Sequence, residues 1–424
     1  MRRFACALLL LAGCHSSTGS SSSQITYWKD VKPIADTKCV GCHSPDNIAP
    51  FTLQSYADFK AQTDKVHVAV VNKVMPPWPP GANCADYQDD RSLSDAQIAT
   101  ITGWIDQGAV EGDPKDYKPG TLASAGLTRV DSTLQIAQPY TPTLAPDEYR
   151  CFVMDWPQAA DTYITGFRAN PGNAPIVHHV IAFLAAPADV AAYQQLDDAD
   201  PAPGYVCFGG PGGPNGGASA HWLGAWAPGS LGSDFPAGTG IKVPAGSKVI
   251  LQVHYNLTNN NNMPDQTSVD FKLDSSVQKE ALIQPWTNPQ WIQQKTMVIP
   301  AGAADQMYSY AFDPSPYWGL ITNNIIGSGA TVTMYSAGLH MHTRGTHISM
   351  SINHGDGKKE CMLDIPKWDF HWQGAYAFDK PKTFAPGDQI YLECHWNNAD
   401  STMDRNWGEG TADEMCLGSF YITQ

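Results

Sequence analysis

Two histidines separated by one residue lie in the run Gly338 to Gly345. The residues before them, 330–336, are of types that favour a β-strand. Because alternate side chains of a strand share a face, we expect His340 and His342 to point the same way and Met341 the opposite way. Two imidazoles on one face can hold a metal ion if a third ligand comes from elsewhere, and that ligand decides which metal is bound. The alternative is a pair of solvated or hydrogen-bonded histidines.

Three further elements of the expected β-region, after residue 126, carry side chains that bind metals. His178 and His179 are adjacent in a predicted strand, so both can reach one ion only at a bulge or strong twist, which nearby prolines permit. His254 lies in the apolar strand 249–255, where a lone histidine is more often a satisfied core residue. Met415 precedes a cysteine, and a lone methionine is usually part of the core.

The C-x-x-C-H attachment signal of a c-type haem occupies residues 39–43. Cys39 and Cys42 would form thioethers to the haem, and His43 would reach the iron. A thioredoxin-like redox pair expects a βαβ pattern, and half of a zinc site expects a second Cys/His pair nearby; the sequence offers neither. Met75, followed by two prolines, is the candidate sixth ligand. His67 is the alternative, and it would give a lower reduction potential.

The residues around this signal predict short helices. Residues 55–74 are mostly compatible with a helix, and Ser94 to Gln97 form a capping sequence for a second helix at 98–107. The order of haem signal, helix, Met-Pro loop and closing helix resembles a class I cytochrome c.

The composition of the 424 residues favours β-structure. Charged residues make up 16%, whereas 37 glycines and 32 prolines supply many turns. The net charge of −15 argues against a nucleic-acid partner, which would select a basic surface.

The N-terminus is typical of an exported lipoprotein. Two arginines precede an apolar run that is too short to span a bilayer, and the run ends in Leu11-Ala-Gly-Cys14. Cleavage before Cys14 would leave a lipidated cysteine on a Ser-rich tether, with the protein in the periplasm or at the outer membrane or cell surface. The alternative is an ordinary cleaved signal peptide. Export places the ten cysteines in an oxidising compartment, where disulfides form.

Beyond the helical region, short strand-like runs alternate with Pro, Gly and Asn turns, which is an all-β pattern. We therefore expect a multidomain, mainly β protein with a small α-helical cytochrome c domain first. The expected segments are the signal peptide and tether at 1–24, the haem domain at 25–118, a linker at 119–126, and β-domains at 127–285 and 286–424.

The ordered set of metal-binding elements resembles the copper type II, ascorbate-dependent monooxygenases. The matching runs are Asp147 to Cys151, His178-His179, Gln252 to Tyr255, His340-x-His342 and Asp413 to Cys416. This resemblance implies two jelly-roll β-sandwiches with one copper ion each, facing across a solvent-filled cleft. His178, His179 and His254 would hold an electron-storing copper. His340, His342 and Met415 would hold the copper that binds O₂, because imidazole and thioether ligands together suit Cu(I) better than zinc. The first domain is also similar to the cytochrome domain fused to bacterial copper monooxygenases.

The same resemblance suggests disulfides. Cys416 beside Met415 resembles the family cysteine that fixes the ligand strand, with Cys394 as its partner, and Cys151 with Cys207 is a reasonable second pair. Cys84 and Cys361 then remain, and whether they pair is left open.

Some positions depart from the family pattern. Gly338 stands where the peptide-hydroxylating enzyme has a substrate-anchoring arginine, and Leu417 and Ser419 replace its substrate-contacting Asn and Tyr. We therefore expect a substrate other than a peptidylglycine carboxylate, less charged and of unknown identity.

The expected activity is hydroxylation of an aliphatic C–H bond of a small molecule or peptide with O₂. Two copper ions and one covalent haem c are the expected cofactors, and the haem would relay electrons from a periplasmic donor to the first copper. Membrane contact is expected through the N-terminal lipid alone. The alternative is a lipid-anchored electron-transfer or copper-binding protein without hydroxylase activity; a zinc-binding sandwich is disfavoured by Met415.

Overall fold

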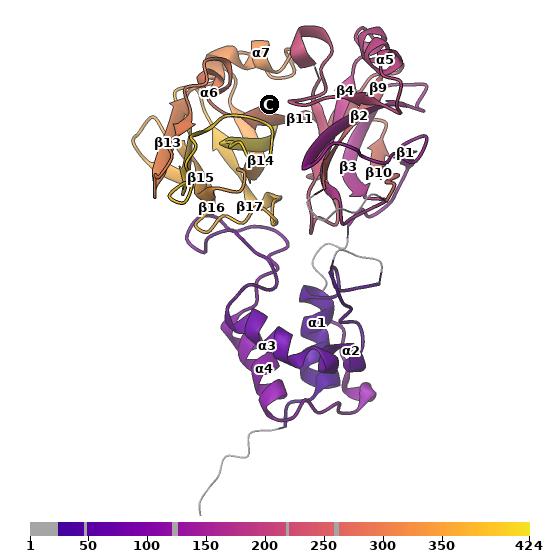
Figure 1. Cartoon of the computed structure of the whole chain (residues 1–424), viewed down its shortest axis with the longest axis vertical. Coiled ribbons are helices and arrows are strands. Elements are labelled where there is room, and N and C mark those ends of the chain that lie inside the picture. Colours follow the sequence, from indigo (N-terminus) through magenta and orange to yellow (C-terminus); the bar gives the residue numbers. More distant parts are fainter. Residues whose placement is uncertain (1–23, 46–48, 121–125, 218–219, 258–262) are drawn as a thin grey trace, which may run out of the picture.

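The computed structural model describes residues 24–45, 49–120, 126–217, 220–257 and 263–424. The chain is mainly β, as expected, with a helical N-terminal part below two β-parts that lie side by side (Figure 1). The expected signal peptide and Cys14, the expected site of lipid attachment, lie outside the described residues. Among the residues described, no helix is long and apolar enough to cross a membrane.

The helical part is built from short helices. They are η1 (Tyr27–Val31), α1 (Lys32–Lys38), α2 (Tyr56–Ala61), α3 (Thr63–Val71), α4 (Asp95–Asp106) and η2 (Pro114–Asp116). The predicted capping box is confirmed at α4, where the Gln97 N–H donates to Ser94 Oγ and the Ser94 N–H donates to the Gln97 side chain. The predicted helical stretch 55–74 is two helices, because the backbone at Gln62 leaves the helical region with φ −117° and ψ 13°.

Aromatic rings form the core of this part. Tyr27, Phe59 and Trp104 are fully buried and contact one another with ring centroids 5.8–6.0 Å apart. The helices thus enclose a hydrophobic core of their own, separate from the cores of the β-parts.

The first β-part follows residue 131. Its elements are β1 (Ser132–Gln135), β2 (Asp147–Asp155), β3 (Thr162–Asn170), β4 (Val177–Ala185), α5 (Val190–Ala199), β5 (Tyr205–Val206), η3 (Pro214–Gly217), β6 (Trp222–Trp226), β7 (Ser233–Asp234), β8 (Thr239–Val243), β9 (Lys248–Asn256) and β10 (Ser268–Asp274). Strands β4, β9 and β2 are hydrogen-bonded neighbours, so histidines of β4 and β9 can meet.

The second β-part completes the chain. Its elements are β11 (Lys279–Trp286), α6 (Pro289–Gln293), β12 (Val298–Ile299), β13 (Gln306–Phe312), η4 (Ser315–Tyr317), α7 (Trp318–Ile321), β14 (Val332–His340), β15 (Gly345–Asn353), β16 (Lys359–Ile365), β17 (Ala375–Phe384), β18 (Gln389–Trp396), β19 (Arg405–Asn406) and β20 (Leu417–Thr423). Buried side chains of β14 and β20 share one hydrophobic cluster with those of β15, β16 and β18, which form the sheet β13-β18-β15-β16. The core therefore lies between two sheets.

One strand joins the two β-parts. Strand β11 pairs with β6 and β8 of the first part and, antiparallel over residues 281–286, with β20 of the second. Residue 285, where the sequence suggests a boundary, lies inside this strand. A continuous ladder of hydrogen bonds thus crosses from one β-part to the other and fixes their relative placement at this edge.

Three disulfides form among the residues that the structure describes. They are Cys84–Cys361, Cys151–Cys207 and Cys394–Cys416. The two pairs suggested by the family resemblance are confirmed, and the pair left open is formed. Cys84–Cys361 ties the segment after α3 to β16, beside Tyr87, whose hydroxyl donates to the Met362 carbonyl at 2.9 Å.

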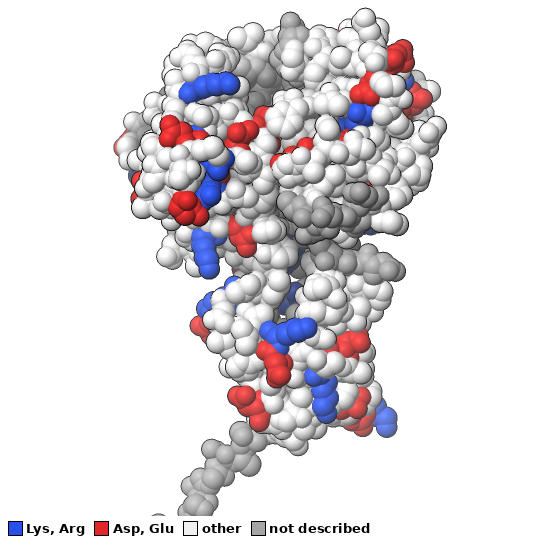
Figure 2. Space-filling view, in the orientation of Figure 1, with Lys and Arg blue, Asp and Glu red and all other residues white. Residues whose placement is uncertain are grey.

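Charged side chains are mixed on the surface. On the face drawn in Figure 2, Lys and Arg side chains are interspersed with Asp and Glu over the β-parts and the helical part. Many are paired locally, as Lys73 with Asp95 at 3.0 Å, and such exposed pairs stabilise a fold only slightly.

Candidate functional site

Strands β4 and β9 bring three histidines together. The β4–β9 register shifts between Val177 and His179, so His178 is the extra residue of a bulge, one of the two distortions that would let both histidines reach one ion. His179 lies directly opposite His254. The Nδ1 atom of His179 is 3.3 Å from Nδ1 of His178 and 3.4 Å from Nδ1 of His254, so three ring nitrogens converge on one point.

Burial keeps these three imidazoles neutral. Burial lowers the pKa of His178 to about 3 and lowers that of His179 well below its usual value. The pKa of His254 is also lowered by burial, against the opposing effect of Asp147. A neutral imidazole keeps a lone pair on one nitrogen, which is the form that binds a metal.

Asp147 orients His254. The His254 Nε2–H donates to Asp147 Oδ1 at 2.9 Å, which leaves the Nδ1 lone pair facing the other histidines. The ring of Tyr149 stacks on His254 with centroids 4.0 Å apart and planes 8° from parallel. Although burial opposes it, hydrogen bonds from His254 and Thr411 hold the pKa of Asp147 below its usual value, so its carboxylate stays ionised.

His340 and His342 lie where β14 ends. Their ring centroids are 5.1 Å apart, and Met341 between them is fully buried in the core, so the predicted alternation is confirmed. The His340 Nδ1–H donates to the Gln373 side chain, and the His342 Nδ1–H donates to the Asp413 carbonyl at 3.1 Å. With both Nδ1 atoms engaged in this way, the Nε2 atoms are left for a ligand.

The segment 413–415 runs beside these histidines. Glu414 accepts hydrogen bonds from the backbone N–H groups of His342 and Arg344 and from Trp396 Nε1. Met415 follows directly, is 6% exposed, and is held next to the Cys394–Cys416 disulfide. Met415, the predicted third ligand, therefore lies on the segment that is hydrogen-bonded to His342.

The two histidine sets meet across the β-parts. The rings of His179 and His340 lie 6.2 Å apart, and Phe370 stacks on His178 at 4.3 Å while approaching His342 at 5.9 Å. The expected arrangement of two sites facing across an open cleft is replaced here by aromatic contact. Polar contacts reinforce it, because Thr411 donates through its N–H and hydroxyl to Asp147 at 3.0 and 2.6 Å.

A loop between β16 and β17, residues 366–374, contacts both histidine sets. Its Trp368 Nε1–H donates to the His342 carbonyl at 3.0 Å, its Phe370 stacks on His178, and its Gln373 holds His340. We call it the 366–374 loop. The sequence interpretation missed it and also missed the role of Asp147; three aromatic residues within five positions, Trp368 to Trp372, were the one available signal.

The C-x-x-C-H segment follows α1. Cys39 and Cys42 are not disulfide-bonded, and burial raises the pKa of the Cys39 thiol to about 12. The His43 Nδ1–H donates to the Phe51 carbonyl at 2.9 Å, which leaves Nε2 available. His67 lies on α3 and Met75 follows the same helix, so the choice between them as sixth ligand stays a prediction.

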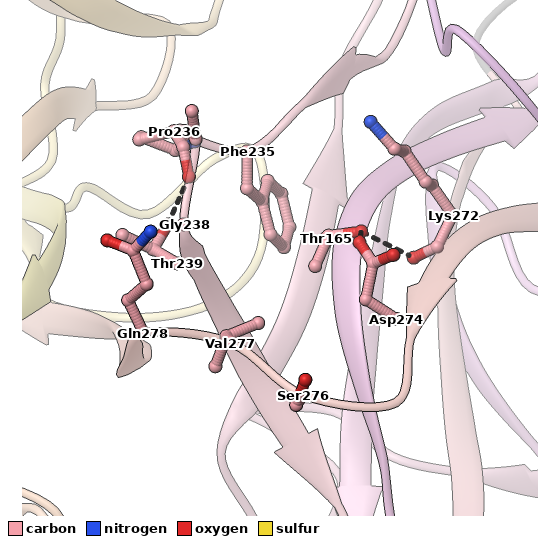
Figure 3. Close-up of a pocket in the computed structure, with 11 residues that line it drawn as sticks. Thr165, Phe235, Pro236, Gly238, Thr239, Lys272, Asp274, Ser276, Val277 and Gln278 are labelled. Carbon is pink, nitrogen blue, oxygen red and sulfur yellow. Dashed lines mark hydrogen bonds between the residues drawn. The ribbon is translucent and has the colours of Figure 1, made fainter.

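A separate pocket of about 330 Å³ lies beside β3, β8 and β10 (Figure 3). Thr165, Phe235 and Gln278 line it, and the Thr165 hydroxyl donates to Asp274 at 2.7 Å. No histidine lines this pocket, so it belongs to a different place in the fold from the histidine sets.

Comparison with known proteins places both β-parts in one family. Residues 134–262 match the N-terminal domain, and residues 321–423 the C-terminal domain, of the copper type II ascorbate-dependent monooxygenases. Together the matches cover more than half of the chain and contain both histidine sets and Met415. The chain therefore belongs to the copper type II, ascorbate-dependent monooxygenase family.

Individual relatives are distant. Human DBH-like monooxygenase protein 1 is 22% identical over 78% of this chain and 55% of its own length. Mouse DBH-like monooxygenase protein 2 is 24% identical over 59% of this chain and 38% of its own length. Chicken DBH-like monooxygenase protein 1 is 30% identical over 20% of this chain and 14% of its own length. The chain thus spans about half or less of the length of these relatives. A solved viral protein, VP2 of infectious bursal disease virus, aligns over 69% of this chain and 70% of its own, at 11% identity and a TM-score of 0.14.

Proposed function

We propose that this protein is a copper-dependent monooxygenase that hydroxylates an aliphatic C–H bond of a small molecule or peptide. The balanced reaction consumes the substrate, O₂, two electrons and two protons, and yields the alcohol and water. The observation that carries the proposal is the meeting of the two histidine sets, one from each family-matched region, with the rings of His179 and His340 6.2 Å apart.

The side chains present fit copper. Three converging imidazole nitrogens form one donor set, and two imidazoles with the Met415 thioether form the other. Bound copper would supply the one-electron chemistry that reduction of O₂ requires. The chain orients the donors through Asp147, Gln373 and the Asp413 carbonyl, and burial excludes protons from the imidazoles.

The surroundings of His340 support an uncharged substrate. Gly338 pairs across β14 and β20 with Ser419, and His340 pairs with Leu417, so all three departures from the peptide-hydroxylating pattern adjoin the same site. A Cβ at Gly338 would lie 2.7 Å from Ser419 Oγ, which leaves little room for a longer side chain in this arrangement. We propose that these positions form a small, uncharged wall beside the substrate.

We propose further that Cys39, Cys42 and His43 hold a covalent haem, with Met75 as the sixth ligand. The free state of both thiols and the hydrogen bond from His43 Nδ1 to the Phe51 carbonyl support it, because iron-binding histidines usually donate their other N–H to a carbonyl. The haem would supply single electrons.

Contacts lead from this segment toward the histidine sets. Leu231 packs against Gly41, and Arg91 donates to the Gly229 carbonyl at 2.7 Å. A Cβ on Gly229 would lie 3.5 Å from the ring of Trp372, which precedes Gln373 in the 366–374 loop. These contacts support a relay of electrons from a periplasmic donor through the helical part.

We propose that the protein is exported and anchored through a lipid on Cys14, in the periplasm or at the outer membrane. The three disulfides suit an oxidising compartment. A Cys14→Ser variant should leave the membrane fraction and become soluble. Unchanged fractionation would contradict the anchor.

Metal analysis tests the metal content. The purified wild type should hold two copper ions and one iron per chain, and His254→Ala and His342→Ala should each lose one copper and keep the iron. Zinc in place of copper, or a single copper, would contradict the proposal.

Mixing the reduced, copper-loaded protein with O₂ and substrate tests the relay, because the haem should reoxidise as product forms. A haem that stays reduced while product forms would exclude the relay but would not contradict the proposal of two copper sites.

A further inference from the structure

A second cluster of metal-binding side chains lies on the sheet β13-β18-β15-β16. One ring nitrogen each from His347 and His395 and a carboxylate oxygen of Glu393 lie within 4.8 Å of one another. His347 on β15 stands directly opposite His395 on β18, with ring centroids 5.1 Å apart. A register shift between Gly345 and His347 precedes this pair, and such bulges re-aim side chains.

The cluster is on the opposite face of the sheet from the core. Ile348 and Met350 of β15 and Leu392 and Cys394 of β18 are fully buried in the hydrophobic cluster. Because neighbouring strand residues face opposite sides, His347, Glu393 and His395 point outward. Their side chains are 31%, 23% and 23% exposed, so a small ion can reach them from solvent.

Carboxylates surround the two imidazoles. His347 Nε2 is 2.7 Å from Asp364 Oδ1, His395 Nδ1 is 3.0 Å from Asp305 Oδ1, and His395 Nε2 is 3.3 Å from Glu393 Oε1. Asp305 can thus fix the His395 ring as outer carboxylates do in metal sites, with Nε2 left for the ion. The excess of carboxylates over cationic groups gives the cluster a negative charge that favours a dication.

We propose that His347, Glu393 and His395 bind a divalent transition-metal ion, Cu²⁺ or Zn²⁺. Two imidazoles and one carboxylate suit such ions, and Cu²⁺ binds tighter than Zn²⁺ to a given set of this kind. The cluster has no thioether, so it does not share the preference for Cu(I) that Met415 gives the other site. Water completes the coordination on the exposed side. This inference stands on its own residues and does not depend on the hydroxylase activity.

The test is zinc binding by the full-length protein that holds two copper ions per chain and has been dialysed to remove any further Cu²⁺. The wild type should take up one Zn²⁺ per chain, measured by equilibrium dialysis and elemental analysis. His347→Gln, Glu393→Gln and His395→Gln should each lose that ion and keep the copper. His354→Gln is the matched control, because His354 also contacts two carboxylates, Asp388 and Glu360, but has no second imidazole beside it. Equal zinc uptake by all variants would overturn the proposal.

A measurement on the wild type guards against variants that misfold. Crystals soaked in Zn²⁺ should show an anomalous peak at the zinc edge between His347 and His395. A soaked crystal without a peak at this position would overturn the proposal, whatever the variants do.

Discussion

Phe370 and His178 stack with ring centroids 4.3 Å apart and planes inclined by 19°, although they belong to different β-parts. The same phenyl ring lies 5.9 Å from His342. One side chain of the 366–374 loop therefore touches a histidine of each set. The hydrogen bonds from Thr411 to Asp147 form a second link between the two β-parts near these histidines.

Replacing Phe370 should loosen the contact between the two sites. In Phe370→Ala, the loss of the ring leaves His178 without its stacking partner, so the two Cu(II) ions should couple magnetically less strongly in the EPR spectrum than in the wild type. Phe312→Ala is the control, because Phe312 stacks on Tyr310 and Tyr317 away from the histidines. Equal coupling in wild type and Phe370→Ala would show that the ring does not set the separation.

Asp147→Asn should weaken one copper site. The carboxylate holds His254 through Nε2 and is ionised, and loss of such an outer partner typically lowers metal affinity about 10- to 100-fold. Competitive titration with a copper chelator should show one weakened copper and one unchanged. Asp155→Asn, at the exposed end of the same strand, should bind both ions as the wild type does. If Asp147→Asn titrates with the chelator as the wild type does, Asp147 does not help to hold the copper ion.

Removing the Cys84–Cys361 disulfide should make residues 81–88, which connect the helical part to β16, open more often. Loss of a native disulfide typically costs about 2–5 kcal/mol, and this one links residues 277 positions apart. The double variant Cys84→Ala/Cys361→Ala should exchange amide hydrogens faster at residues 81–88, where the Gly81 N–H donates to the Asp364 carbonyl at 2.8 Å. The Cys151→Ala/Cys207→Ala variant should not change exchange there. Unchanged protection of 81–88 in the first variant would mean that other contacts suffice.

His354 should make stability depend on pH. Burial lowers its pKa, but the hydrogen bonds to Asp388 and Glu360 together outweigh burial, and the net shift is upward. Because the folded pKa exceeds the unfolded value of about 6.5, this contribution is complete below that pH and disappears as pH rises through the folded pKa. The free energy of unfolding of the metal-free wild type, measured with a denaturant, should therefore fall over that pH window relative to that of His354→Gln. Parallel pH profiles for the two proteins would contradict this assignment.

Local patterns predicted local structure well. Strand alternation placed Met341 in the core and its neighbours outside it. Because adjacent residues of a regular strand face opposite sides, the sequence indicated that His178 and His179 could share an ion only at a bulge or strong twist, and a bulge is present there. The capping residues Ser94 and Gln97 specified the start of α4. In each case the deciding interaction joins residues a few positions apart, so the local sequence contains it.

The contacts between the β-parts could not be predicted in this way. Thr411 binds Asp147 from 264 positions away, and Phe370 meets His178 from the other β-part, so no periodicity signals either contact. The family resemblance suggested two separated sites, whereas β11 and the 366–374 loop draw them together. Neither the substrate nor the sixth ligand of the proposed haem follows from the residues alone, because each depends on groups that come together only in the fold.

Oxygen-isotope labelling tests the central claim most directly. The reduced, copper-loaded protein is given ¹⁸O₂ and a panel of uncharged aliphatic substrates, and products are analysed by mass spectrometry, with His342→Ala as the inactive control. The account predicts an alcohol that carries one ¹⁸O atom from O₂ and is absent from the control. Product oxygen derived from water, or O₂ consumed with hydrogen peroxide as the sole product, would contradict it.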